Sequence, residues 1–273
     1  MKTVNHHNRR FLGIAEIGAR LHDRLEGVGD MAWKVERILD IGWLRFHTEE
    51  VLQRWGISDI FLPHWWELLV RHNEYKTDEL IRLILSARWG LLLFERALIQ
   101  AYNDLMLWSP RVSINIFIED LQNPLFRHTL ERIAMGFREE DRSRITIEIN
   151  EKPCNLNENF EMNLLWLHER GYRIVLDDVS ITQWNPKESI TRKILMASRI
   201  LRYSSGIWRV IDGVKIDHYD SKDLMEHPHT RGRLDIIPRS LTITMEWMTK
   251  REKPYMIPYR TTHIQIYGET SWI

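Results

Sequence analysis

From about residue 60 onward, short apolar runs alternate with longer runs of helical spacing, and few folds are compatible with this alternation. Strands that alternate with helices in one domain indicate parallel β/α units. The predicted strands are residues 65–71, 112–118, 144–150, 173–178, 213–217 and 255–259. Repeated units of this kind predict an α/β fold, either a β/α barrel or a doubly wound sheet.

The predicted strands have two different faces. In the strand 112–118, Ile114 and Ile116 share one face and Asn115 lies on the other, because side chains alternate along a strand. If the aliphatic faces pack under the helices of a barrel, the polar faces meet inside it, where ionised groups are costly unless they are paired or bound to metal. The residues concerned are Glu67, Arg71, Asn115, Glu148, Asp177, Asp178 and Lys215.

This set of side chains indicates a metal site. Carboxylate and amide oxygens are hard ligands, which suit Mg²⁺ or Mn²⁺ better than zinc. Any one of the charges has a simpler explanation as a solvated group at a strand end. Their matching positions on successive strands favour a shared site.

The composition argues against nucleic-acid partners and against a membrane location. Lys plus Arg and Asp plus Glu both number 38, so the net charge is zero and broad electrostatic binding to DNA or RNA is not expected. The single cysteine, Cys154, cannot form an internal disulfide, and no run is long and apolar enough for a membrane span. We therefore expect a cytoplasmic protein without a membrane anchor. Residues 1–40 are predicted to form a helical extension, and residues 41–273 the barrel domain.

The polar strand residues lie in five short motifs that follow one another along the chain. They are WELLVR at 66–71, VSIN at 112–115, IEINE at 147–151, GYRIVLDD at 171–178 and VKID at 214–217. This ordered set resembles the EAL domain family, the cyclic di-GMP phosphodiesterases. The resemblance implies a modified (β/α)8 TIM-like barrel and cyclic di-GMP as the ligand.

The resemblance also implies a role for each matching residue. Two divalent metal ions, Mg²⁺ or Mn²⁺, would be held by the residues Glu67, Asn115, Glu148, Asp177 and Asp178. Lys215 would act with Glu67 in catalysis, beside the attacking water. Arg71 would contact a phosphate of the ligand, and Gln53 is a possible substitute for a ligand-binding Gln near the first strand. Glu151 would brace the loop after Asp178.

Two departures from the family pattern matter for activity. After Asp178 the family has Phe-Gly-Thr-Gly, whereas this chain continues with residues 179–184 and no glycine. The family also has a Glu-bearing strand near the C-terminus, and the segment that we match to it, 254–260, has no carboxylate. A strand around Gln265 would follow too closely for a parallel crossover. We therefore expect a C-terminal unit that is incomplete or rebuilt.

These observations leave alternatives open. The first is an enzyme that binds cyclic di-GMP with divalent metal and hydrolyses it to the linear dinucleotide pGpG. The second is a catalytically inactive regulator that senses cyclic di-GMP or acts through a protein partner. A third is a truncated barrel with an exposed strand edge. The resemblance further implies a homodimer, although the segment after Asp178, where relatives often dimerise, is where this chain differs most.

Overall fold

The computed structural model describes most of the chain from residue 44 onward. The described residues are 44–54, 61–72, 75–86, 88–107, 111–150, 157–181, 210–237, 239–247, 258 and 260–271. The predicted helical extension at 1–40, Cys154 and Glu151 lie outside these residues. No helix in the described part is long and apolar enough to cross a bilayer.

Eight strands form a closed barrel in the order in which they occur along the chain. The strands are β1 Leu44–Arg54, β2 Phe61–His72, β3 Val112–Ile116, β4 Ile145–Asn150, β5 Arg173–Val179, β6 Gly213–Ile216, β7 Thr242–Trp247 and β8 His263–Ser271. Parallel pairing runs from β2 through to β8, and β1 pairs antiparallel with β8. The predicted TIM-like α/β barrel is therefore confirmed, and the antiparallel first strand is its modification.

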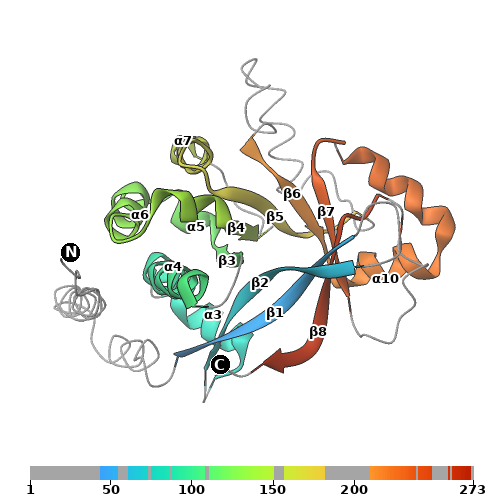
Figure 1. Cartoon of the computed structure of the whole chain (residues 1–273), viewed down its shortest axis with the longest axis horizontal. Helices are drawn as coiled ribbons and strands as arrows, with labels where there is room; N and C mark the ends of the chain where they lie inside the picture. Colours follow the sequence, from blue (N-terminus) through green and yellow to red (C-terminus); the bar gives the residue numbers. More distant parts are fainter. Residues whose placement is uncertain are drawn as a thin grey trace, which may run out of the picture. The chain divides into compact units, whose positions relative to one another are not determined.

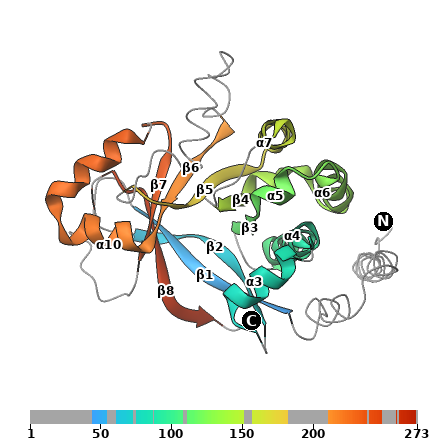
Figure 2. The ribbon, with the colours of Figure 1, turned by 180° about the vertical axis from the view of Figure 1, so that it is seen from behind.

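Helices follow most of the strands. They are α3 Thr77–Ser86, α4 Gly90–Leu107, α5 Ile118–Leu121, α6 Phe126–Ala134, α7 Glu158–Glu169 and α10 His218–Glu226, with 3-10 helices at Glu139–Arg144 and Pro228–Ile236. Figures 1 and 2 show α4 beside β3 and α7 beside β5. Helix α7 begins where the Asn157 side chain accepts the Phe160 N–H, and Gly171 follows its end with φ +86, a conformation that glycine adopts without strain.

The chain forms two compact units. One comprises Met1–Arg45 and Val70–Trp89, and the other comprises Phe46–Leu69 and Gly90–Ile273. In the first unit, α3 buries Leu80 and Ile84. The second unit carries strands β3 to β8 and the larger hydrophobic core.

The two strand faces behave as the alternation predicts. Ile114, Ile147 and Leu176, from the aliphatic faces, are fully buried in one hydrophobic core with residues of α4, α6 and α7. The register pairs Asn115 with Glu148 and Asn150 with Asp177, so the polar residues of neighbouring strands lie at similar heights. The barrel thus gathers them at the carboxyl ends of its strands.

The C-terminal strands correct one prediction. The strand beside β6 is β7, at Thr242–Trp247, and not the segment 255–259, which lies largely outside the described residues. With β7 there, the chain has room to return to β8, so Gln265 does lie on the final strand. The described residues between β7 and β8, Pro258 and 260–262, form no helix. The last unit is therefore short, but its strand is present and closes the barrel.

Strand β6 packs tightly against β7 at Gly213. A Cβ at this position would overlap the Thr242 side chain and lie 3.1 Å from the Thr242 carbonyl oxygen. We expect Gly213→Ala to lower the free energy of unfolding by about 1–3 kcal/mol, because overpacking forces backbone shifts. Urea unfolding should detect this loss, and Gly232→Ala, whose Cβ would meet nothing within 4 Å, is the matched control. Equal stability of the two variants would contradict the tight packing.

A carboxylate cluster around a buried lysine

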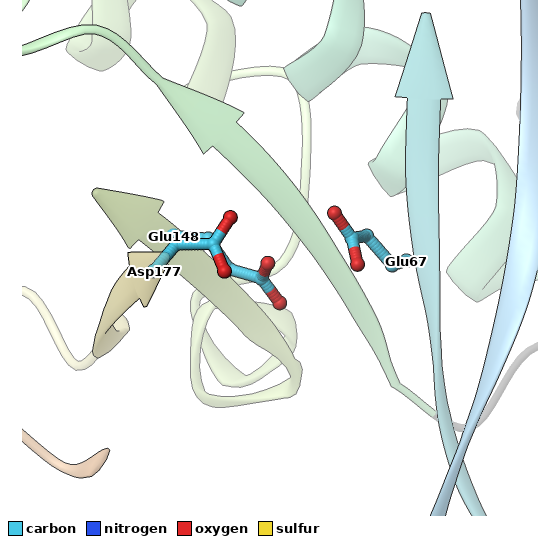
Figure 3. A group of neighbouring side chains, drawn as sticks. All are labelled: Glu67, Glu148 and Asp177. Atoms are coloured by element: carbon cyan, nitrogen blue, oxygen red, sulfur yellow. The ribbon is translucent and has the colours of Figure 1, made fainter. Parts of the chain in front are cut away.

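The barrel brings together predicted site residues from successive strands. Glu67 comes from β2, Asn115 from β3, Glu148 from β4, Asp177 from β5 and Lys215 from β6. Figure 3 shows the carboxylates of Glu148 and Asp177 facing that of Glu67. Oxygen atoms of these three acids lie within 4.8 Å of one another.

The Lys215 ammonium lies at the centre of the cluster. Its Nζ donates hydrogen bonds to Glu67 Oε2 at 3.0 Å and to Glu148 Oε2 at 2.8 Å, and it lies 3.0 Å from Asp177 Oδ1. The residue is only 1% exposed. Burial alone would lower the pKa of Lys215, but the surrounding carboxylates raise it well above the usual range. Lys215 is therefore a fixed positive charge inside the barrel.

Glu67 is the best-satisfied acid of the cluster. Asn115 Nδ2 donates to its Oε1 at 2.7 Å, and Gln265 Nε2 donates to its Oε2 at 2.6 Å. Burial raises the pKa of Glu67, but the Lys215 charge and the donors Lys215, Asn115 and Gln265 together lower it below the usual value. Glu67 is thus held as a carboxylate.

The other two acids of this group are less well compensated. Burial, with the neighbouring charges of Glu67 and Asp177, raises the pKa of Glu148 well above its usual value. Burial and the charge of Glu67 raise the pKa of Asp177 to about 6, against the opposing effect of Lys215. Like charges at this spacing favour either protonation or an additional cation.

Glu246 is a residue of this cluster that the sequence analysis missed. It lies on β7, with Oε1 3.7 Å from Lys215 Nζ, and its oxygen lies within 4.8 Å of those of Asp177 and Asp178. Burial raises its pKa to about 8. The signal was present, since Ile243 and Met245 alternate with Thr244 and Glu246 as in the other strands. The conclusion that no carboxylate occupies the C-terminal strand was therefore wrong.

Asp178 lies at the rim of the cluster. It is exposed, has φ +54, and accepts a hydrogen bond from Asn150 Nδ2 at 2.5 Å. A positive φ is strained for a residue with a side chain, so its neighbours must hold this conformation. Asp178 turns the chain at the end of β5 and puts its carboxylate beside Asp177 and Glu246.

Helix α10 holds the segment that follows Asp178. Asp220, in the first turn of α10, accepts hydrogen bonds from the Ser180 hydroxyl at 3.0 Å and from the Ile181 N–H. Asp217 caps the same helix by accepting the Asp220 N–H at 2.8 Å. These bonds fix the start of the segment that lacks the family's glycines.

The donor set fits divalent cations. Glu148 Oε1 is buried without a hydrogen-bond partner among the described residues, and Asn115 Nδ2 donates to Glu67 beside it. Carboxylate and amide oxygens are the ligands of hard cations. The acids form two overlapping groups able to hold metal, Glu67 with Glu148 and Asp177, and Asp177 with Asp178 and Glu246.

Three predicted site residues are not part of this described cluster. Arg71 follows Glu67 on β2 but belongs to the other compact unit, where its guanidinium donates to the Val70 carbonyl at 2.9 Å. Gln53 lies on β1 opposite His263 of β8, and its side chain lies outside what the structure describes. Glu151 also lies outside the described residues. Their roles stay predictions.

The comparisons with known proteins agree with the sequence motifs. Residues 66–189 match the family model of the EAL domain. This segment includes Glu67, Asn115, Glu148, Asp177 and Asp178 and ends before Lys215 and Glu246. No curated protein sequence matches the chain.

Solved structures match over a longer part of the chain. The PaMucR phosphodiesterase in its c-di-GMP complex has a TM-score of 0.65 at 13% identity, with 88% of this chain and 96% of that chain covered. The EAL enzyme Bd1971, bound to cAMP and cyclic di-GMP, has a TM-score of 0.62 at 14% identity, with 97% and 73% covered. The Xanthomonas citri FimX EAL domain with c-diGMP has a TM-score of 0.63 at 11% identity, with 92% and 96% covered. At these identities the similarity establishes the fold.

Proposed function

This chain is a divergent EAL domain protein, and on that premise we propose that it binds cyclic di-GMP with divalent metal ions and hydrolyses it to pGpG. The observation that carries the proposal is Glu246, whose carboxylate faces Lys215 and joins Asp177 and Asp178. Glu246 and Gln265 lie on the last two strands. They are candidates for the C-terminal Glu and Gln that the resemblance requires. The main sequence argument against catalysis is thereby removed.

Each residue of the cluster has a distinct task in this proposal. Glu67, Asn115, Glu148 and Asp177 would hold one cation, and Asp177 and Asp178 would hold or orient the second, each Mg²⁺ or Mn²⁺. When bound, the cations supply Lewis acidity that activates water and neutralises charge on the phosphodiester. Lys215 adds a compact positive charge next to the reacting phosphate, and Arg71 orients a ligand phosphate through a planar pair of donors.

Glu246 has the protonation behaviour that proton transfer requires. In the metal-free protein burial raises its pKa to about 8, close to neutral pH, where a carboxyl group can both hold and release a proton. Lys215, 3.7 Å away, favours the carboxylate form when the proton leaves. We therefore assign the general acid–base step to Glu246.

A second function, binding without turnover, is favoured by the segment after Asp178. Residues 179–184 contain no glycine, and Asp220 ties down Ser180 and Ile181. A loop whose start is held in place can bind a ligand, but this restraint limits the rearrangements that catalysis uses. In this case the protein is a cyclic di-GMP receptor, or acts through a protein partner. The homodimer implied by the resemblance remains a prediction, to be checked by light scattering.

The deciding experiment is incubation of purified protein with cyclic di-GMP and Mn²⁺, followed by chromatography of the nucleotides. We expect pGpG from the wild type and none from Glu67→Gln, because the variant loses a charged ligand of the cluster. Glu169→Gln, at an exposed residue at the end of α7, is the matched control. Equilibrium dialysis with cyclic di-GMP separates the alternatives. Binding without pGpG would support the receptor, and neither binding nor pGpG would exclude the enzyme and the receptor and would favour the role through a protein partner.

A further inference from the structure

A second polar cluster lies at the amino ends of the barrel strands, away from the carboxylate site. Trp65 precedes Glu67 by two residues on β2, and His263 precedes Gln265 by two on β8. Arg173 is the first residue of β5, four residues before Asp177. Even spacings keep these side chains on the same strand faces as the site residues, but nearer the other end of each strand.

Three aromatic rings of this cluster contact one another. The ring centroids of Trp65 and His263 are 4.5 Å apart, and His64 lies 5.1 Å from each of them. The Arg173 guanidinium lies over the Trp65 ring at 5.7 Å. The guanidinium of Arg111, just before β3, lies 2.9 Å from His64 Nε2. Because a guanidinium can only donate, Arg111 is the donor of this hydrogen bond. Two guanidinium groups thus border one aromatic cluster.

Arg173 lies near a second arginine, Arg111, and near one described acid, Asp212. The like charge of Arg111 lowers the pKa of Arg173, in addition to the larger effect of burial. Burial, followed by the two arginine charges, lowers the pKa of His64 to about 4, so that this ring is neutral at pH 7. Asp212 is the acid that acts on Arg173, and one of its oxygens already accepts the Ile174 N–H at 2.8 Å. Among the described residues, no carboxylate pairs with Arg173 at ion-pair distance.

Two buried ring nitrogens beside the arginines lack partners. Trp65 and His263 are each 2% exposed, and neither Trp65 Nε1 nor His263 Nε2 has a hydrogen-bond partner among the described residues. Indole nitrogen can only donate. The Thr262 hydroxyl donates its proton to the Ile243 carbonyl at 2.9 Å, so at 2.8 Å it accepts the proton of His263 Nδ1, and Nε2 of that ring is an acceptor. A buried donor without an acceptor costs about 1–3 kcal/mol, so a missing acceptor is expected here.

We propose that the amino end of the barrel binds an oxyanion, phosphate or a phosphate ester, between Arg173, Trp65 and His263. The oxyanion would accept the indole N–H and balance the charge of Arg173, and the hydroxyl of a singly protonated phosphate group would donate to His263 Nε2. Anions with several oxygens match a planar guanidinium better than chloride does. The inference is independent of cyclic di-GMP hydrolysis, because its residues do not overlap with the carboxylate cluster.

The test follows the indole N–H signals of the ¹⁵N-labelled wild-type protein while inorganic phosphate is added. Trp65→Phe, which keeps an aromatic ring and removes the donor, identifies the Trp65 signal. We expect that signal to shift and saturate with phosphate in the wild type. Arg173→Gln should weaken the response at least tenfold. Arg170→Gln is the matched control, since Arg170 also lies over a tryptophan, Trp166, at 5.2 Å, but on the surface.

Guanosine monophosphate in place of phosphate distinguishes the two sources of the ligand. Tighter binding of the nucleotide would support a phosphate ester, and tighter binding of phosphate would support the free ion. A Trp65 signal that does not respond to either probe would overturn the proposal and leave water as the partner of these nitrogens. Because the wild-type measurement needs no variant, misfolding of Trp65→Phe or Arg173→Gln cannot conceal this outcome. An equal response of Arg173→Gln and the wild type would also overturn it.

Discussion

Lys215→Met is expected to lower the melting temperature of the metal-free protein by about 10 °C at pH 8. Lys215 Nζ lies 3.0 Å from Glu67 Oε2, 2.8 Å from Glu148 Oε2 and 3.0 Å from Asp177 Oδ1. Removing one partner of a buried ion pair costs about 3–5 kcal/mol, because the remaining charges are left unpaired. In a chain of this length, each kcal/mol corresponds to roughly 2–4 °C.

The loss should depend on pH with a definite sign. Acids whose pKa is raised in the folded state favour folding below their unfolded pKa, and this contribution is lost as pH rises through the folded pKa. For Asp177 and Glu246 these values are about 6 and about 8. Lys215 lowers both pKa values, so they rise further in the variant. The variant should therefore be close to the wild type at pH 5 and fall progressively behind it up to pH 8. Thermal unfolding at several pH values measures this difference.

Two controls separate charge from packing in the Lys215 experiment. Lys222→Met removes a half-buried lysine that lies 3.8 Å from Glu226 on α10, and it should change the melting temperature little. Added Mn²⁺ should stabilise Lys215→Met more than the wild type, because the cation replaces the lost ammonium among the carboxylates. A loss that is the same at pH 5 and pH 8 would contradict the electrostatic explanation.

Glu246→Gln is expected to lower the rate of pGpG formation by about 10²–10⁴-fold, the usual contribution of a general acid–base group. The amide keeps the size of the side chain but cannot exchange a proton. Cyclic di-GMP affinity should change by less than about threefold, since Glu67 and Arg71 are unaltered. Steady-state kinetics and equilibrium dialysis on the same preparation give both quantities.

Stability distinguishes a catalytic role of Glu246 from a structural one. Burial raises the pKa of Glu246 to about 8, so its ionised form opposes folding above that pH. Glu246→Gln should therefore be as stable as the wild type, or more so, at pH 8.5. Glu226→Gln, at an exposed position that ends α10, is the matched control. Hydrolysis within threefold of the wild type would assign the proton transfer to another group.

Local alternation was sufficient to predict much of the site. Asn115, Glu148 and Lys215 each lie on a strand whose aliphatic residues face the helices, and that alternation depends only on the pleat of a single strand. The short motifs around these residues were also sufficient to indicate the family. Both kinds of information are contained in short segments.

The errors came from long-range pairing. A strand predicted at 255–259 in place of Thr242–Trp247 hid Glu246, and it also made Gln265 appear too close for a parallel crossover. Which segment pairs with β6 depends on contacts such as that of Gly213 with Thr242, which periodicity does not report. One misplaced strand therefore accounts for both mistakes.

The sequence alone determined the α/β class and the strand face on which each polar group lies, because these follow from residue type and periodicity, and the resemblance of its ordered motifs indicated the barrel and the family. Only the tertiary structure decided that the Lys215 ammonium meets Glu67, Glu148, Asp177 and Glu246. It also decided that Trp65, His263 and Arg173 gather at the opposite strand ends. Such distances depend on strand register and barrel closure, which join residues far apart in the chain and fix the charge balance of each cluster.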